Sequence, residues 1–186
     1  FTLEEISEAA AGPKWFQSYL FQDWGVTQNL VDRAEASGYR ALILTLDAHW
    51  APKRERDIRN DYRRTPGPNY AGMGLEETGR GESPRPVVDP SATWRDLERL
   101  RGQTRLPIVL KGILDPDDAL LALEHGAQGL IVSNHGGRVL DCLPASIDAL
   151  PAIATAVAGR VPLLLDGGIV RGSDVFKALA LGASAV

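Results

Sequence analysis

The residues best suited to chemistry follow directly after an apolar run at positions 129–132. They are Ser133, Asn134 and His135, then two glycines, then Arg138. An imidazole can accept a proton near neutral pH, and a guanidinium can bind a carboxylate through two parallel hydrogen bonds. Because catalytic groups of parallel α/β folds gather at the carboxyl ends of strands, this segment predicts a site that combines a base with an anion anchor.

Other polar residues occupy the ends of further expected strands. Asp47 and Lys111 each close an apolar run, and Thr45 lies two residues before Asp47. Gln17 and Tyr19 share one face of an aromatic-rich strand, because alternate residues of a strand point the same way. Each has an ordinary alternative: Thr favours strands, Asp caps loops, and a Lys at a sheet edge extends its amine to water.

A glycine-rich segment runs from Asp166 through Gly167 and Gly168 to Ser173. Glycines expose backbone N–H groups, and a helix that starts near Ser173 would favour an anion at its N-terminus. The segment therefore predicts a phosphate-binding loop. A plain glycine turn between a strand and a helix is the alternative.

The elements that must position these residues alternate between apolar runs and helical patterns. Continuous apolar strands are expected where helices cover both faces of a sheet. Five of them without a Rossmann glycine fingerprint favour an α/β chain of the (β/α)₈ TIM-barrel type over a doubly wound sheet. A full barrel needs about 250 residues, so residues 1–186 would form one partial domain, roughly five-eighths of a barrel. The predicted strands span 14–21, 39–46, 106–110, 130–133 and 161–166, with a sixth opening at 185, and the predicted helices span 25–37, 94–101, 115–124, 147–157 and 173–181.

Three further local patterns complete the prediction. Residues 60–90 carry five prolines and five glycines among charged residues, which predicts a long mobile loop. Trp15, Phe16 and Phe21 are predicted to lie in the core, as aromatic residues on strands usually do. Thr2, with a glutamate three residues later, predicts a capped helix start.

The composition excludes several classes of function. The 186-residue chain is 44% apolar with a net charge of −4, which argues against nucleic-acid and polybasic membrane binding. Its single cysteine, Cys142, forms no internal disulfide and favours a reducing compartment. The three histidines and the cysteine lack ligand spacing, so no metal site is predicted. No apolar run approaches the ~20 residues of a membrane helix, and no signal peptide opens the sequence.

Five motifs in the same order resemble the FMN-dependent 2-hydroxy-acid oxidases and dehydrogenases, the family of glycolate oxidase, lactate oxidase, mandelate dehydrogenase and flavocytochrome b2. The resemblance implies that the chain covers about strands 3 to 7 of the barrel, with the first two strands and most of the eighth outside it. At Val170 many members of the family carry an arginine, so a side-chain cation is missing there. The motifs lie at 15–19, 44–47, 110–112, 133–141 and 166–183.

The resemblance also implies an activity. The enzyme would oxidise a small (S)-2-hydroxy acid to the 2-oxo acid, with FMN as cofactor. His135 would be the catalytic base, assisted by Asp47, and the substrate would be bound by Arg138, Tyr19 and Arg54. For Arg54, a place in a solvated charge run is nearly as good an interpretation. The FMN contacts would be Gln17, Thr45, Lys111, Ser133, Asp166, Gly167 and Gly168.

The sequence says less about the electron acceptor, the oligomeric state and the cellular compartment. Oxygen is favoured over a membrane quinone because the loop at 60–90 has no membrane-binding character. A homo-oligomer, by resemblance a tetramer, is expected in the cytoplasm, or in the peroxisome of a eukaryote. Two alternatives stay open. One is another FMN-dependent barrel, such as type 2 isopentenyl diphosphate isomerase, which would share the phosphate loop but not the His-Gly-Gly-Arg sequence. The other is a barrel fragment without catalytic activity.

Overall fold

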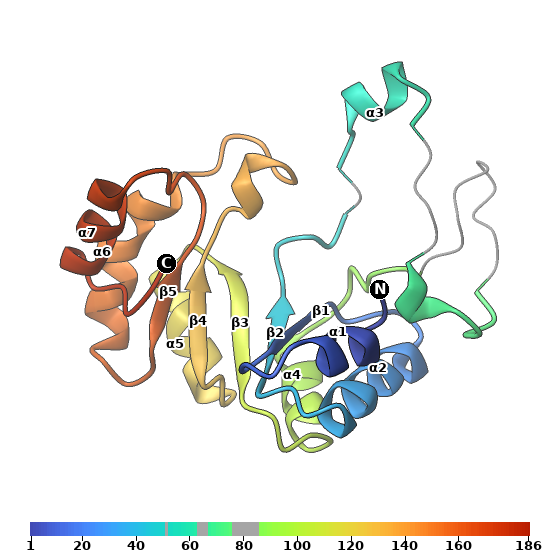
Figure 1. The fold of residues 1–186 in the computed structure, drawn as a ribbon. Helices are drawn as coiled ribbons and strands as arrows, with labels where there is room; N and C mark the ends of the chain where they lie inside the picture. The colour runs from blue at the N-terminus through green and yellow to red at the C-terminus, as the bar shows by residue number, and fades with distance from the viewer. Residues whose placement is uncertain (51, 63–66, 76–85) are drawn as a thin grey trace.

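The computed structural model describes residues 1–50, 52–62, 67–75 and 86–186. Its centre is a parallel five-stranded sheet whose strands follow one another in chain order (Figure 1). A doubly wound sheet would reverse that order at a switch point, so the order agrees with the predicted wall of a barrel. The strands are β1 (Trp15–Ser18), β2 (Ala41–Thr45), β3 (Ile108–Ile113), β4 (Gly129–Val132) and β5 (Leu163–Leu165).

Helices connect successive strands and begin where the sequence places caps. Thr2 and Glu5 form the predicted capping box, and the Asp115 side chain accepts from two amides at the start of a helix whose first residue is Pro116. Proline suits this position because its missing N–H would be unpaired there anyway. The α-helices are α1 (Leu3–Ala9), α2 (Trp24–Ala36), α3 (Glu55–Arg59), α4 (Trp94–Arg101), α5 (Pro116–Glu124), α6 (Ser146–Val157) and α7 (Gly172–Ala180).

The register of the sheet separates a packing face from a chemical face. Leu44 of β2 pairs with Leu110 of β3, and both are fully buried in the main core. Thr45 and Lys111, one residue further along, are the next pair in this register. Because successive side chains of a strand point to opposite faces, this polar pair lies on the face opposite the core leucines, at the carboxyl end of the sheet.

The structure corrects some sequence-based expectations. Trp15 is 47% exposed, so its assignment to the core is wrong, whereas Phe21 is buried and Phe16 packs against the core. Trp15 alternates with Phe16 along β1 and therefore lies on the face away from that core. β1 is shorter than the predicted 14–21, and β3 continues past Leu110.

The excursion between β2 and α4 extends beyond the carboxyl ends of the strands and carries α3 (Figure 1). Of the predicted mobile loop at 60–90, positions 63–66 and 76–85 lie outside the described residues. Val88 forms an isolated bridge with Phe21, and the Asp89 amide donates to the Leu20 carbonyl at 2.9 Å. The return of the excursion is thus tied to the segment after β1.

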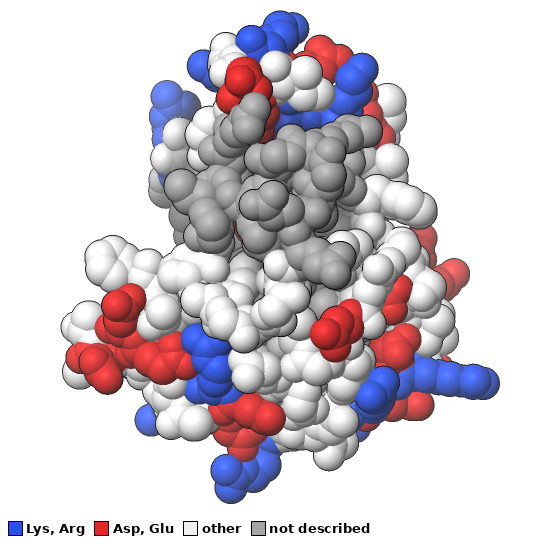
Figure 2. Space-filling view, turned by 90° about the vertical axis from the view of Figure 1, so that its right-hand side faces the viewer, with Lys and Arg blue, Asp and Glu red and all other residues white. Residues whose placement is uncertain are grey.

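The surface carries both signs of charge. In Figure 2, basic and acidic side chains are interspersed on the visible face, and α3 contributes both kinds at its top. No helix among the described residues is long and apolar enough to cross a membrane.

Candidate active site

A histidine and an aspartate meet where β2 and β4 end. His135 Nδ1 lies 2.8 Å from Asp47 Oδ1, and their side chains are only 11% and 10% exposed. His135 adopts a left-handed backbone conformation, with φ of 56°, in a 3₁₀ turn at His135–Gly137. Histidine tolerates this region better than most residues. The turn directs the imidazole across β3, which lies between β2 and β4.

Cationic and phenolic groups lie around this pair. Arg138 donates from Nε to the His135 carbonyl at 3.3 Å, which leaves its terminal nitrogens free of that bond. Burial, and then the negative charge of Asp47, raise the pKa of Tyr19, while the charges of Arg138 and Arg54 oppose the rise. Tyr19 therefore lies within electrostatic range of Asp47, Arg138 and Arg54, which with His135 are the other residues predicted to act on a substrate.

The residues predicted to contact FMN form a second polar group. Lys111 donates to Ser133 Oγ and pairs with Asp166, and its side chain is 12% exposed. Gln17 donates to Thr45 Oγ1 at 3.0 Å. Asp166 Oδ1 is buried and has no hydrogen-bond partner among the described residues. Contributions from all five strands thus converge at one end of the sheet.

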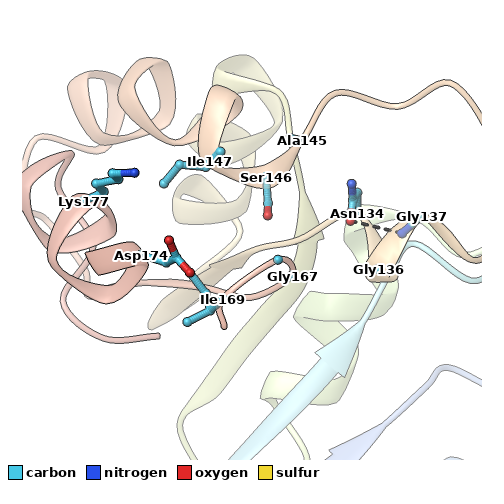
Figure 3. A pocket seen from close by; sticks show the side chains of 11 residues that line it. Asn134, Gly136, Gly137, Ala145, Ser146, Ile147, Gly167, Ile169, Asp174 and Lys177 are labelled. Carbon is cyan, nitrogen blue, oxygen red and sulfur yellow. Dashed lines mark hydrogen bonds between the residues drawn. The ribbon is translucent and has the colours of Figure 1, made fainter. Parts of the chain in front are cut away.

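A cleft of about 450 Å³ opens beside Gly167 and Gly168, between the starts of α6 and α7. Figure 3 shows Lys177 and Asp174 of α7 on one side of it and Ser146 and Asn134 toward the other. Gly167 has φ of 87°, and a Cβ there would meet Ser146 Oγ at 3.3 Å. Glycine therefore suits this turn both in conformation and in space.

The predicted helix N-terminus is already partly occupied. Asp174 accepts from the amides of Val170 and Arg171 at 3.1 and 2.9 Å, and these bonds lower the pKa of its carboxyl group. Two amides that a phosphate could use at this helix start therefore donate to the protein's own carboxylate. An anion in the cleft would depend more on the backbone at Gly167 and Gly168.

Three residues to which the sequence assigned no role hold the site together. Asn134 accepts from the Gly137 amide at 3.2 Å and donates to the Pro144 carbonyl at 3.1 Å, which fixes the turn that carries His135. Asparagine before a glycine-rich turn is a known signal for such side-chain turns. Ser146 donates to the Asp166 carbonyl, and Gly112 lies against Asp47. No group of three or more His, Cys, Asp or Glu in the described part of the chain could hold a metal ion.

Residues 1–186 match the family described as FMN-dependent dehydrogenase. The chain belongs to this family. Among curated relatives, it is 48% identical over 194 residues to a 2-hydroxyacid oxidase from Dictyostelium discoideum and 48% identical over 199 residues to an L-lactate oxidase from Nostoc sp.. Both alignments cover the whole chain, but only 49% and 54% of the relatives. The chain thus spans about half the length of the curated relatives that it matches.

Solved structures of similar proteins confirm the fold. A mandelate oxidase variant with (S)-mandelic acid superposes with a TM-score of 0.86 at 42% identity, and a lactate oxidase from Pediococcus acidilactici with 0.88 at 39%. The whole chain is covered in both cases, against 51% and 50% of the other chain. The predicted α/β class and the incomplete barrel are confirmed, as is the predicted family.

Proposed function

We propose that this chain forms the larger part of the active site of an FMN-dependent (S)-2-hydroxy-acid oxidase, which converts the hydroxy acid to the 2-oxo acid. The partly buried His135–Asp47 pair, at 2.8 Å with Arg138 beside it, carries the proposal. A base and a guanidinium at one strand end match the two demands of such a substrate: a proton to remove and a carboxylate to hold. The relatives named above are oxidases of small hydroxy acids.

His135 acts as the base through Nε2. Asp47 accepts a hydrogen bond from Nδ1–H, so the lone pair lies on Nε2, the nitrogen away from Asp47. When the imidazole takes up the substrate's proton, the Asp47 carboxylate stabilises the imidazolium, as the buried aspartate of a hydrolytic triad does. The low exposure of both side chains strengthens this interaction because water screens it weakly.

Arg138, Arg54 and Tyr19 hold the substrate. A guanidinium presents two parallel donors that fit a carboxylate, and the Arg138 Nε bond to the His135 carbonyl ties the anchor to the base. Tyr19, with its raised pKa, keeps its proton and donates a hydrogen bond from the phenol. These contacts orient the substrate toward His135.

The residues at the strand ends fit FMN. Asp166 Oδ1, a buried acceptor without a partner among the described residues, suits a hydroxyl donor such as those of a ribityl chain. Lys111 would supply a fixed positive charge beside FMN. Further hydrogen-bond donors and acceptors for FMN would come from Gln17, Thr45, Ser133, Gly167 and Gly168. When bound, FMN supplies the two-electron acceptor that the oxidation requires.

We also propose an electron acceptor, an oligomeric state and a cellular compartment for the enzyme. Oxygen is the final electron acceptor, in keeping with relatives named as oxidases. A homo-oligomer, a tetramer by family resemblance, resides in the cytoplasm or, in a eukaryote, in the peroxisome. One relative from Arabidopsis thaliana is named as a peroxisomal (S)-2-hydroxyacid oxidase.

Anaerobic mixing of the full-length protein with a panel of short 2-hydroxy acids tests the activity. The flavin absorbance should bleach with at least one acid, and His135→Gln should slow bleaching by about 10²-fold or more, because a positioned base contributes that much. The matched control is His125→Gln, remote from the site at the end of α5, where His125 pairs with Glu98. Unchanged bleaching in His135→Gln, or no bleaching of the parent by any acid, would refute the proposal.

A further inference from the structure

Gly112 lies within β3, directly after Lys111 and next to the carboxyl end of β2. Its φ is 106°, a conformation that L side chains rarely adopt. The pairing of β3 with β4 shifts register between Lys111 and Ile113, as at a β-bulge, which is a common means of redirecting a strand beside a site. A glycine is therefore built into the strand that separates His135 from Asp47.

The space beside Gly112 is filled by the aspartate of the catalytic pair. A Cβ built on Gly112 would lie 2.6 Å from both Cβ and Cγ of Asp47 and 2.9 Å from its Oδ2. These distances are shorter than any ordinary contact between heavy atoms. The Asp47 side chain thus occupies the volume in which any other residue at position 112 would place its first carbon.

Few other contacts hold this carboxylate. Oδ1 bonds to His135, while Oδ2 is buried without a hydrogen-bond partner among the described residues. Backbone contact with Gly112 therefore limits where the side chain can lie. A carboxylate with only one hydrogen bond has little to resist displacement if that contact changes.

We propose that Gly112 is a positioning residue of the active site. Because glycine has no side chain, it leaves the space in which the Asp47 side chain lies against His135. The inference rests on the proposed function for its catalytic consequence, but not for its geometry. A methyl group at position 112 would have to push Asp47 away by about 0.8 Å to turn the 2.6 Å approach into an ordinary contact of 3.4 Å, and a 2.8 Å bond lengthened by that much exceeds hydrogen-bond range. The imidazolium would lose its counter-charge while Arg138 stays in place.

The test compares Gly112→Ala with Gly182→Ala in the full-length protein. Gly182 is the matched control, because its φ is 109° and its added Cβ would meet the Ala154 Cβ at 2.7 Å, far from the site. Gly112→Ala should lower kcat for 2-hydroxy-acid oxidation by about 10- to 100-fold with KM within threefold, the split expected when only transition-state stabilisation is lost. Gly182→Ala should leave both values near those of the parent. Equal effects of the two variants would overturn the proposal.

A double-mutant cycle shows whether Gly112 acts through Asp47. In an Asp47→Gly background neither the carboxylate nor the Cβ that the new methyl group would meet remains, so Gly112→Ala should cost less than twofold in kcat. A full additional loss in that background would assign the effect to general disruption and overturn the proposal.

Crystal structures provide a readout that needs no activity. In Gly112→Ala, the distance between His135 Nδ1 and Asp47 Oδ1 should exceed hydrogen-bond range. An unchanged distance would refute the positioning role of Gly112, even if the parent protein oxidises no hydroxy acid. If Gly112→Ala does not fold, Gly112→Ala combined with Asp47→Gly removes the clashing side chain and should fold. If both variants fail to fold, the glycine is needed for a reason other than the space that Asp47 occupies, and the proposal is overturned.

Discussion

At the scale of single residues, Asp47 determines which nitrogen of His135 is free. Its carboxylate can only accept a hydrogen bond, so it selects the Nδ1–H tautomer and leaves Nε2 available as the proposed base. In Asp47→Asn the amide can donate to Nδ1 and favour the opposite tautomer. We expect kcat/KM to fall by about 10²- to 10⁴-fold, measured by steady-state kinetics. Asp148→Asn, an exposed carboxylate in the first turn of α6, should change it less than twofold.

Tyr19 is expected to act on binding rather than on proton transfer. Burial and the charge of Asp47 raise its pKa above the usual value of 10, so the phenol stays protonated and can donate at neutral and mildly alkaline pH. Tyr19→Phe should raise KM by about tenfold, the value of one hydrogen bond to a charged group, with kcat within a few-fold. The ratio of the two KM values should stay constant from pH 7 to 9. A ratio that falls toward one across that range would mean that the phenol ionises there.

At the scale of elements, the sequence predicts best where one interaction dominates. The capped start of α5 at Pro116 and the boundaries of α4 emerge correctly because proline, aspartate and threonine act locally. The close approach of Gly112 to Asp47 could not be foreseen, because Asp47 lies 65 positions earlier in the chain. Helix α3 was missed for a related reason: its residues are charged, and no apolar period marks it.

The candidate site also contains some residues that the sequence predicts and others that it does not. The sequence identifies His135 and Arg138 because their types and spacing suit one ligand. Asn134 bonds to the backbone of Gly137 and of Pro144. Ser146 bonds to the backbone carbonyl of Asp166. A chain without coordinates does not reveal which carbonyl such a side chain will find. The roles of Asn134 and Ser146 therefore require the structure, whereas the proposed reacting groups could be named from the sequence.

The contact of α1 with α2 should depend on pH. Glu4 accepts from Arg33 at 2.6 and 2.9 Å, and this guanidinium lowers the Glu4 pKa from 4.5 to about 2. A folded pKa below the unfolded value stabilises the protein above pH 4.5, and this stabilisation is lost as the pH falls toward 2. Because the Glu4 side chain is 40% exposed, water screens the pair, and we expect only ~0.5–1 kcal/mol.

Urea unfolding of Glu4→Gln and the parent at pH 7, 5, 4 and 3 measures this contribution. The difference in unfolding free energy should be constant at pH 7 and 5 and should shrink below pH 4.5. Glu8→Gln, also on α1, serves as the control and should show little difference at any pH. A Glu4→Gln difference that does not change between pH 7 and 3 would exclude the charge of Glu4 as its source.

At the scale of the whole molecule, the sheet has two edges. In the described part of the chain β1 pairs with β2 alone, while β5 pairs with β4 and has a single isolated bridge to Ala185. Unpaired strand edges are templates for association with other chains. Large apolar side chains are also exposed near these edges and along α7, where a closed barrel would need them covered: Trp15, Val170, Phe176, Leu179 and Leu181.

These features predict that residues 1–186, produced alone, associate with one another. Light scattering after size exclusion should show species larger than a monomer that grow with concentration, and an apolar dye such as ANS should bind. Phe176→Glu, at a side chain 74% exposed on α7, should reduce both signals. Ile6→Glu, 45% exposed on α1, should not. A sharp monomer peak without dye binding would mean that the open sheet is protected in a way that its edges and exposed residues do not suggest.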